Sequence, residues 1–129
     1  MTEKAKCHVL WSVNEGVLEI VYKGEVTHDT FEDVLNETNA IIEANKAKKV
    51  IADCRACGNK TEPSQWYHYL RNYHHSILET RYAVVDIPEN EKFKTATMKA
   101  GLTSLAWFTD MDAARKWMKK DRTIKISVP

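Results

Sequence analysis

The run from Lys49 to Cys54 constrains the fold more than any other stretch of the sequence. Its residues are mostly apolar and end in the acid and the thiol of Asp53 and Cys54, with helix-forming sequence on both sides. A short apolar run of this kind is typical of a strand buried on both faces in the middle of a parallel sheet. In open α/β sheets, sites gather where such strands pass into loops at their carboxyl ends. We therefore expect any site to lie near residues 53–65.

The segment before this strand predicts an antiparallel hairpin followed by a helix. Residues 7–13 and 17–23 alternate between apolar and polar side chains, and Gly16 between them can adopt the positive φ of a tight turn. Gly24 is expected to end the second strand. Apolar residues at helical spacing then predict an amphipathic helix from Thr27, its expected N-cap, to about Asn45.

The segment after the central strand alternates between helices and strands. The expected elements are a helix from Pro63, a buried strand at 82–86, a helix at 88–100, a short strand at 104–108 and a last helix that starts with an acidic variant of the capping box, Thr109-Asp110-Met111-Asp112. In the last helix, Ala114, Trp117 and Met118 are expected to be buried. The order β-β-α-β-α-β-α-β-α predicts a single α/β domain, residues 1–129, with a mixed sheet of four to five strands and helices packed on it.

The C-terminal tail, residues 121–129, has the pattern of a further strand. Ile124, Ile126 and Val128 alternate with polar residues. A free apolar strand is expected to pair, either with an edge strand of its own domain or with a second copy of the chain. A homodimer through this tail is therefore one hypothesis.

Composition and charge narrow the class of protein. The chain has 129 residues, 43% of them hydrophobic, and a net charge of +1. This charge argues against nucleic-acid binding, and no apolar run approaches the roughly 20 residues needed to cross a bilayer. The N-terminus lacks the apolar region of a secretory signal. The chain has three cysteines, an odd number, and we expect them to be reduced thiols rather than disulfides. We expect a cytoplasmic domain without membrane insertion and without a cofactor.

Several motifs, taken in order, resemble the SpoIIAA-like branch of the STAS superfamily, the domains related to anti-sigma-factor antagonists. The motifs are Val17-Leu18-Glu19-Ile20 running into Gly24-Glu25-Val26-Thr27, a strand ending in Asp53, Tyr82-Ala83-Val84-Val85-Asp86, and Trp107-Phe108-Thr109-Asp110 followed by Ala113-Ala114-Arg115-Lys116-Trp117. The resemblance covers about residues 8–119. It implies a small non-catalytic module that binds a partner protein or a small apolar, lipid-like molecule.

The chain departs from this family where a phosphorylation site would be expected. In the sporulation-type antagonists, a phosphorylatable Ser follows the central strand at the start of a helix. Residues 53–58 of this chain contain neither Ser nor Thr, and Thr61 and Ser64 come only later. The phosphorylation role is therefore not transferred to this chain.

The loop after the central strand and the aromatic helix that follows it form the expected binding site. Residues expected to contact a ligand or partner are Asp53, Arg55, Cys57, Thr61, Ser64, Trp66, Tyr67 and Leu70. Tyr67 lies off the apolar stripe and is expected to be exposed. One interpretation is that the aromatic residues simply form core, and another is that they line a groove between this helix and the first one.

Cysteine and histidine side chains in this region suggest two alternatives, a redox function and a zinc site. Cys54 and Cys57 form a C-x-x-C pair, so a thiol redox protein is the alternative function. Together with His68 and His74, the two cysteines have a spacing close to that of a zinc-binding motif. At ~100° per residue, however, the two histidines lie about 120° apart on the helix, which argues against a shared zinc ion.

Asp53, Asp86 and Asp110 could supply oxygens to a magnesium ion, although acids are also common helix caps. No phosphate-binding loop or catalytic triad spacing accompanies these groups. We expect no metal site and no enzymatic activity.

Overall fold

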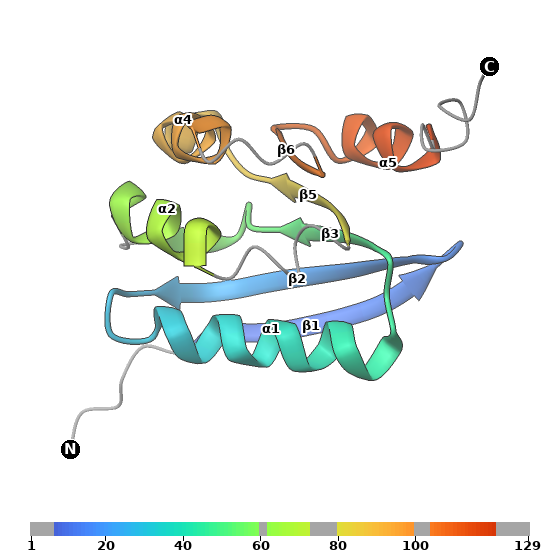
Figure 1. Cartoon of the computed structure of the whole chain (residues 1–129), viewed down its shortest axis with the longest axis horizontal. Helices are drawn as coiled ribbons and strands as arrows, with labels where there is room; N and C mark the ends of the chain where they lie inside the picture. Colours follow the sequence, from blue (N-terminus) through green and yellow to red (C-terminus); the bar gives the residue numbers. More distant parts are fainter. Residues whose placement is uncertain (1–6, 60–61, 73–79, 100–103, 121–129) are drawn as a thin grey trace.

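The computed structural model describes residues 7–59, 62–72, 80–99 and 104–120 (Figure 1). The elements are β1 (Cys7–Asn14), β2 (Val17–Val26), α1 (Phe31–Asn45), β3 (Lys49–Asp53), β4 (Cys57–Asn59), α2 (Pro63–Asn72), β5 (Arg81–Val85), the 3₁₀ turn η1 (Pro88–Asn90), α4 (Glu91–Lys99), β6 (Leu105–Phe108) and α5 (Met111–Lys119). The tail at 121–129, for which we predict a strand and a homodimer contact, lies outside the described residues.

The strands form one mixed sheet with β3 at its centre. The strand order is β1-β2-β3-β5-β6, in which β1 is antiparallel to β2 and the other neighbours are parallel. Both the α/β class and the central position of residues 49–53 are confirmed. Among the described residues the sheet has six strands rather than four or five, because a short strand, β4, pairs with β2.

The hairpin between β1 and β2 has a two-residue turn, one residue shorter than the loop at 14–16 that the sequence predicted. Glu15 and Gly16 have φ values of 54° and 80°, and Asn14 pairs with Val17 across the turn. Two successive positive φ values are the mark of a type I′ turn, whose twist matches that of the strands it joins.

Strand β2 extends further than predicted, and Gly24 does not end it. The first half of β2 pairs with β3 through Leu18–Val21, whereas Gly24–Val26 pairs with β4. Gly24 adopts a φ of 121°, and its N–H donates to the carbonyl of Ala56 at 3.3 Å. The residues after β3 thus return to β2 and provide backbone partners for the part of β2 that β3 does not reach.

Helix starts differ from the prediction where short polar side chains compete for backbone groups. Thr27 does not cap α1, since its N–H donates to Thr30 Oγ1 at 2.9 Å and α1 begins at Phe31. This local bond favours a turn over another helical residue. The last helix begins within the predicted capping-box segment, but Asp110 rather than Thr109 is its N-cap and accepts a hydrogen bond from the Asp112 N–H at 3.2 Å.

The two faces of the sheet are covered by different helices. Leu18, Ile20, Tyr22, Val50 and Ala52 pack against residues of α1, and Val84 and Leu105 pack against residues of α2. Ile51, Ala83 and Val85 face the opposite way and pack against Ala114 and Met118 of α5. Figure 1 shows α2 and α4 together, with α5 well apart from them.

Trp117 is half-buried rather than buried, which corrects the prediction for this residue. Its ring lies beside Phe108, with ring centroids 5.7 Å apart, and the Arg81 guanidinium carbon lies 3.7 Å from the indole centroid. The guanidinium therefore covers one face of the indole, whereas Ala114 and Met118 are fully buried as predicted.

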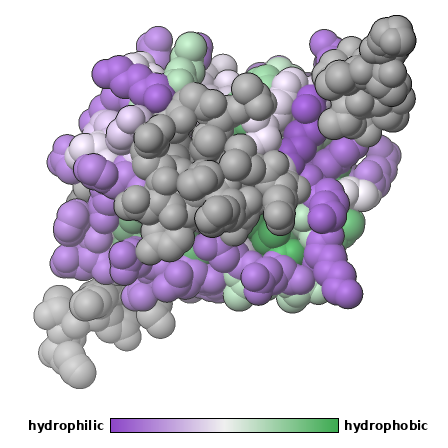
Figure 2. Space-filling model, viewed as in Figure 1, coloured by the Kyte–Doolittle hydropathy of each residue, from purple (hydrophilic) through white to green (hydrophobic). Residues whose placement is uncertain are grey.

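The face of the molecule in Figure 2 is mainly hydrophilic among the residues coloured, with small hydrophobic areas. Larger apolar side chains are exposed elsewhere on the strand β1, where Leu10, Trp11 and Val13 are each about half exposed, at 51%, 50% and 54%. Within the described ranges, no helix is long and apolar enough to cross a membrane.

Candidate functional site: an apolar cavity above the central strands

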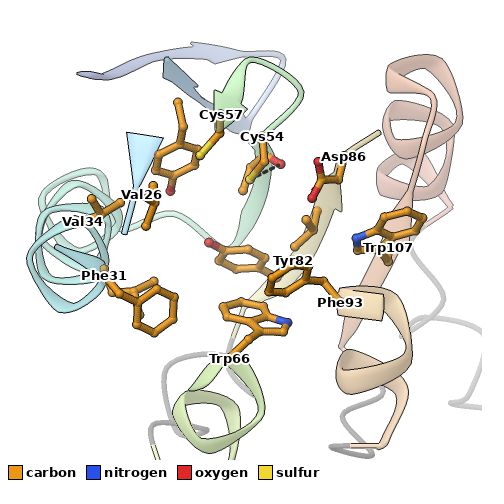
Figure 3. A pocket seen from close by; sticks show the side chains of 14 residues that line it. Val26, Phe31, Val34, Cys54, Cys57, Trp66, Tyr82, Asp86, Phe93 and Trp107 are labelled. Carbon is orange, nitrogen blue, oxygen red and sulfur yellow. Dashed lines mark hydrogen bonds between the residues drawn. The ribbon is translucent and has the colours of Figure 1, made fainter. Parts of the chain in front are cut away.

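A cavity of about 90 Å³ lies between the sheet and helices α1, α2 and α4 (Figure 3). Its lining is mainly apolar and aromatic, and the lining residues are Tyr22, Val26, Phe31, Val34, Leu35, Ala52, Cys54, Cys57, Trp66, Tyr82, Val84, Asp86, Phe93 and Trp107. An apolar cavity with a few polar groups is the usual form of a small-molecule site.

The sheet supplies the floor of the cavity because alternate residues of parallel strands share one face. Ala52 pairs with Val84, and Val84 pairs with Trp107, so these three side chains form a row across β3, β5 and β6. Cys54 and Asp86 directly follow β3 and β5. The cavity therefore lies toward the carboxyl ends of the central strands, as predicted from the sequence of β3.

An aromatic cluster forms the wall between α1 and α2. The ring of Phe31 meets the rings of Trp66 and Tyr69 edge-on, with centroids 6.5 Å and 6.1 Å away, and those two rings stack on each other. Trp66 Nε1 donates to Thr97 Oγ1 at 2.8 Å, which joins α2 to α4. Trp66 thus has its polar atom satisfied while its ring lines the cavity.

The polar groups at the floor are neutral and paired. The hydroxyls of Tyr22 and Thr38 lie 2.6 Å apart, and burial raises the pKa of Tyr22 well above its usual value. Burial also raises the pKa of Tyr82. The lining therefore contains tyrosine hydroxyls that stay protonated throughout the neutral range.

Asp86 brings a carboxyl group to the cavity. Its Oδ1 accepts hydrogen bonds from the Ile87 N–H at 2.8 Å and from Asn90 Nδ2 at 3.0 Å, which fixes the start of η1. Burial raises the pKa of Asp86, an effect that these two hydrogen bonds only partly offset.

Trp107 has a buried indole N–H without a partner. Its Nε1 is shielded from solvent, and no hydrogen-bond acceptor lies within reach among the described residues. In Figure 3 the nitrogen lies on the side of the ring that faces Asp86 and Tyr82. An unpaired buried donor is costly, so this atom stands out in an otherwise satisfied lining.

Comparison with known proteins gives a fold but no sequence family. No protein-family model matches the chain, and the search of curated proteins finds no match. Among solved structures, an anti-sigma factor antagonist from Mycobacterium paratuberculosis superposes with a TM-score of 0.67 and 16% identity, covering 89% of this chain and 96% of that chain. An uncharacterised DUF3478 protein from Shewanella loihica PV-4, with a SpoIIAA-like fold, gives a TM-score of 0.57 and 12% identity, covering 92% of this chain and 98% of that chain.

The chain has the SpoIIAA-like fold. This confirms the fold class that the order of motifs predicted. At such low identity the comparison establishes the arrangement of helices and strands, while function has to be argued from the site itself.

In this SpoIIAA-like domain, the loop after β3 forms a turn and then β4, with Cys57 N–H donating to the carbonyl of Cys54 at 3.1 Å. Burial raises the pKa of the Cys57 thiol to about 12 and raises that of Cys54 as well. Redox-active C-x-x-C pairs instead have a lowered pKa, commonly at a helix N-terminus. The surroundings of these thiols therefore argue against the redox alternative.

The three aspartates have structural partners. Asp53 forms a two-bond ion pair with Arg55, with Nε to Oδ1 at 2.9 Å and Nη2 to Oδ2 at 2.8 Å, and these bonds lower the pKa of Asp53. Asp86 anchors η1, and Asp110 caps α5. Across the part of the chain that the structure describes, no group of three or more His, Cys, Asp or Glu side chains is suited to hold a metal ion.

The structure brings only part of the predicted site together. Cys57 and Trp66 line the central cavity. Ser64 and Tyr67 instead line a second, more polar cavity between α2 and α4, while Asp53 and Arg55 pair with each other outside both. Thr61 lies outside the described residues, and Leu70 belongs to α2 without a described side chain.

Tyr67 is half-buried, which corrects the prediction that it is exposed. It packs against the cluster formed by Val84 and Leu105, because α4 lies beside α2 and covers the side of the helix on which Tyr67 lies. The apolar stripe of α2 predicts which side of the helix faces the sheet, but it does not predict that α4 packs against another side.

Several residues that line the central cavity were not predicted as parts of a site, namely Tyr22, Phe31, Phe93 and Trp107. Asp86 was predicted at the end of a buried strand, but only as a possible magnesium ligand. Trp107 carried a usable signal, because it belongs to a predicted short strand, and the strand-end rule applied to that strand would have pointed to it.

Proposed function

We propose that this domain is a non-enzymatic binding module whose central cavity takes a small apolar molecule. The observation that carries the proposal is the lining: large aromatic and aliphatic side chains surround a space between the sheet and three helices, with few polar atoms. Filling such a space with apolar atoms recovers contacts that the lining otherwise lacks.

The size of the cavity limits the ligand. At about 90 Å³ it is smaller than the engineered cavity of roughly 150 Å³ that accepts benzene. A short aliphatic chain or a small ring is therefore the appropriate class, and a longer lipid-like molecule would place only its end there.

The fold supports a regulatory use of this site. A structure of the same fold is an anti-sigma factor antagonist. Since α1 and α2 both line the cavity, an occupant would alter the packing of helices whose outer faces a partner protein could contact. We therefore infer a regulatory module in the cytoplasm in which ligand binding and partner binding are coupled.

A pair of one-methyl substitutions tests whether the cavity binds ligand. Val84→Ile places a methyl group at the cavity, and Val17→Ile places one on the opposite face, where Val17 packs near Ile51. A methylene-sized group contributes about 0.8 kcal/mol, so Val84→Ile is expected to weaken benzene binding about fourfold while Val17→Ile leaves it unchanged. The measurement is calorimetric titration of each full-length protein with benzene. Absence of benzene binding to the original protein would refute the proposal.

A further inference from the structure

The two tryptophans that line the cavity differ in the state of their N–H groups. Trp66 Nε1 donates to Thr97 Oγ1 at 2.8 Å, and that hydroxyl in turn donates to the Phe93 carbonyl at 2.8 Å. Trp107 Nε1 is shielded from water but has no acceptor among the described residues. Leaving such a donor unpaired is energetically costly, so an acceptor at this position would be stabilising.

The charges around the cavity restrict which acceptor is suitable. Among the residues that the structure describes, the lining contains the carboxyl group of Asp86 and no lysine or arginine. An anionic ligand would bring a second carboxylate close to Asp86 without a cation to balance it, which is unfavourable in a site of low polarity. The Tyr22 hydroxyl is already engaged with Thr38.

We propose that the cavity binds an apolar molecule carrying an uncharged oxygen acceptor, such as a ketone, aldehyde or ester carbonyl, with Trp107 Nε1 as its hydrogen-bond donor. This inference rests on the proposed function and specifies its ligand class. The apolar part of the molecule contacts Val84 and Phe93, and the oxygen lies at the indole nitrogen. Trp107 acts here as a specificity residue, since it selects the oxygen-bearing ligand over a hydrocarbon of the same shape.

Three probes of similar size test this inference: cyclopentanone, cyclopentane and butyrate, the last of which carries a carboxylate. The original protein is expected to bind cyclopentanone, and to bind the carboxylate at least tenfold more weakly. Trp107→Phe keeps an aromatic ring but removes the N–H donor. It is expected to weaken the affinity for cyclopentanone about tenfold while changing the affinity for cyclopentane less than twofold. Trp66→Phe is the matched control, and should change both uncharged probes by the same factor.

The outcomes separate this inference from the proposed function. Equal effects of Trp107→Phe on the ketone and the hydrocarbon would overturn the inference while leaving an apolar site in place. Failure of the original protein to bind any of these probes or benzene would overturn both. If Trp107→Phe does not fold, the indole ¹H–¹⁵N signal of Trp107 in the original protein decides: it should move downfield with cyclopentanone but not with cyclopentane, and equal shifts would refute the inference.

Discussion

Asp86 and Asp53 respond to pH in opposite directions, because their surroundings shift their pKa values in opposite directions. Burial raises the pKa of Asp86, so its contribution to stability is fully present below the ordinary value of 3.8 and is lost as the pH rises through its folded-state pKa. Hydrogen bonds from Arg55 lower the pKa of Asp53, so its contribution is present above 3.8 and is lost as the pH falls.

Substitution by asparagine should reveal this difference. Asp86→Asn keeps an oxygen acceptor for Ile87 and Asn90, and its stability relative to the original protein is expected to rise as the pH is raised from about 4 to 7. Asp53→Asn should show the reverse, losing relative stability as the pH is raised from about 2 to 5. Urea unfolding at several pH values measures both, and a pH-independent difference for Asp86→Asn would contradict its assigned burial.

The helix α5 is the element that closes the face of the sheet opposite the cavity. Met118 is 1% exposed and Ala114 is fully buried, both against Ile51, Ala83 and Val85. In addition, the backbone carbonyls of Met118 and Trp117 accept hydrogen bonds from Lys49 and Arg81, which ties the end of the helix to β3 and β5.

Truncating Met118 should therefore be costly. Met118→Ala is expected to lower the free energy of unfolding by about 2–5 kcal/mol, and Trp117→Ala by less than the ~3–5 kcal/mol of a fully buried tryptophan, because Trp117 is half-buried. Lys116→Ala on the exposed side of the same helix is the control and should change stability by less than about 0.5 kcal/mol. Denaturant unfolding gives the three values, and a Met118→Ala cost as small as that of the control would mean that α5 does not pack as described.

At the other edge of the sheet, β1 presents backbone and apolar side chains that a further strand could cover. Lys119 Nζ lies 3.9 Å from Glu15 Oε1, so α5 ends beside the β1–β2 hairpin. The exposed side chains of Leu10, Trp11 and Val13 lie on this edge strand, where the hypothesis places the pairing of a further strand.

Removal of the tail after Arg122 tests the predicted homodimer. Light scattering should show a dimer for the full chain and a folded monomer for the truncated chain, because pairing between two copies requires the strand. A monomer in both cases would exclude the dimer, whereas a dimer in both would place the interface elsewhere.

Periodicity predicted elements more reliably than it predicted where side chains meet. The apolar run at β3, the turn at Gly16 and the cap at Asp110 act locally, so their outcome could be derived from neighbouring residues. By contrast, β4 forms because residues far along the chain provide hydrogen bonds to the end of β2, and Tyr67 is half-buried because α4 packs beside it. Such features depend on tertiary neighbours that no local pattern specifies.

At the scale of the whole molecule, the two faces of the sheet are packed differently. Alternate residues of β3 separate them: Ile51 contacts the closely packed α5 layer, while Ala52 faces the cavity beneath α1, α2 and α4. The sequence placed the predicted site at the strand ends but did not predict the cavity, which lies between large aromatic side chains of three helices and the smaller side chains of Ala52 and Val84.

The most direct test of an apolar binding site is a methyl NMR titration of the full chain with benzene. Methyl signals of Val34, Leu35 and Val84, which line the cavity, are expected to shift in a saturable manner, while those of Ile51, Val85 and Met118 on the opposite face stay unchanged. Saturable shifts confined to the cavity would support the account. Absence of saturable shifts, or shifts at the α5 face instead, would contradict it.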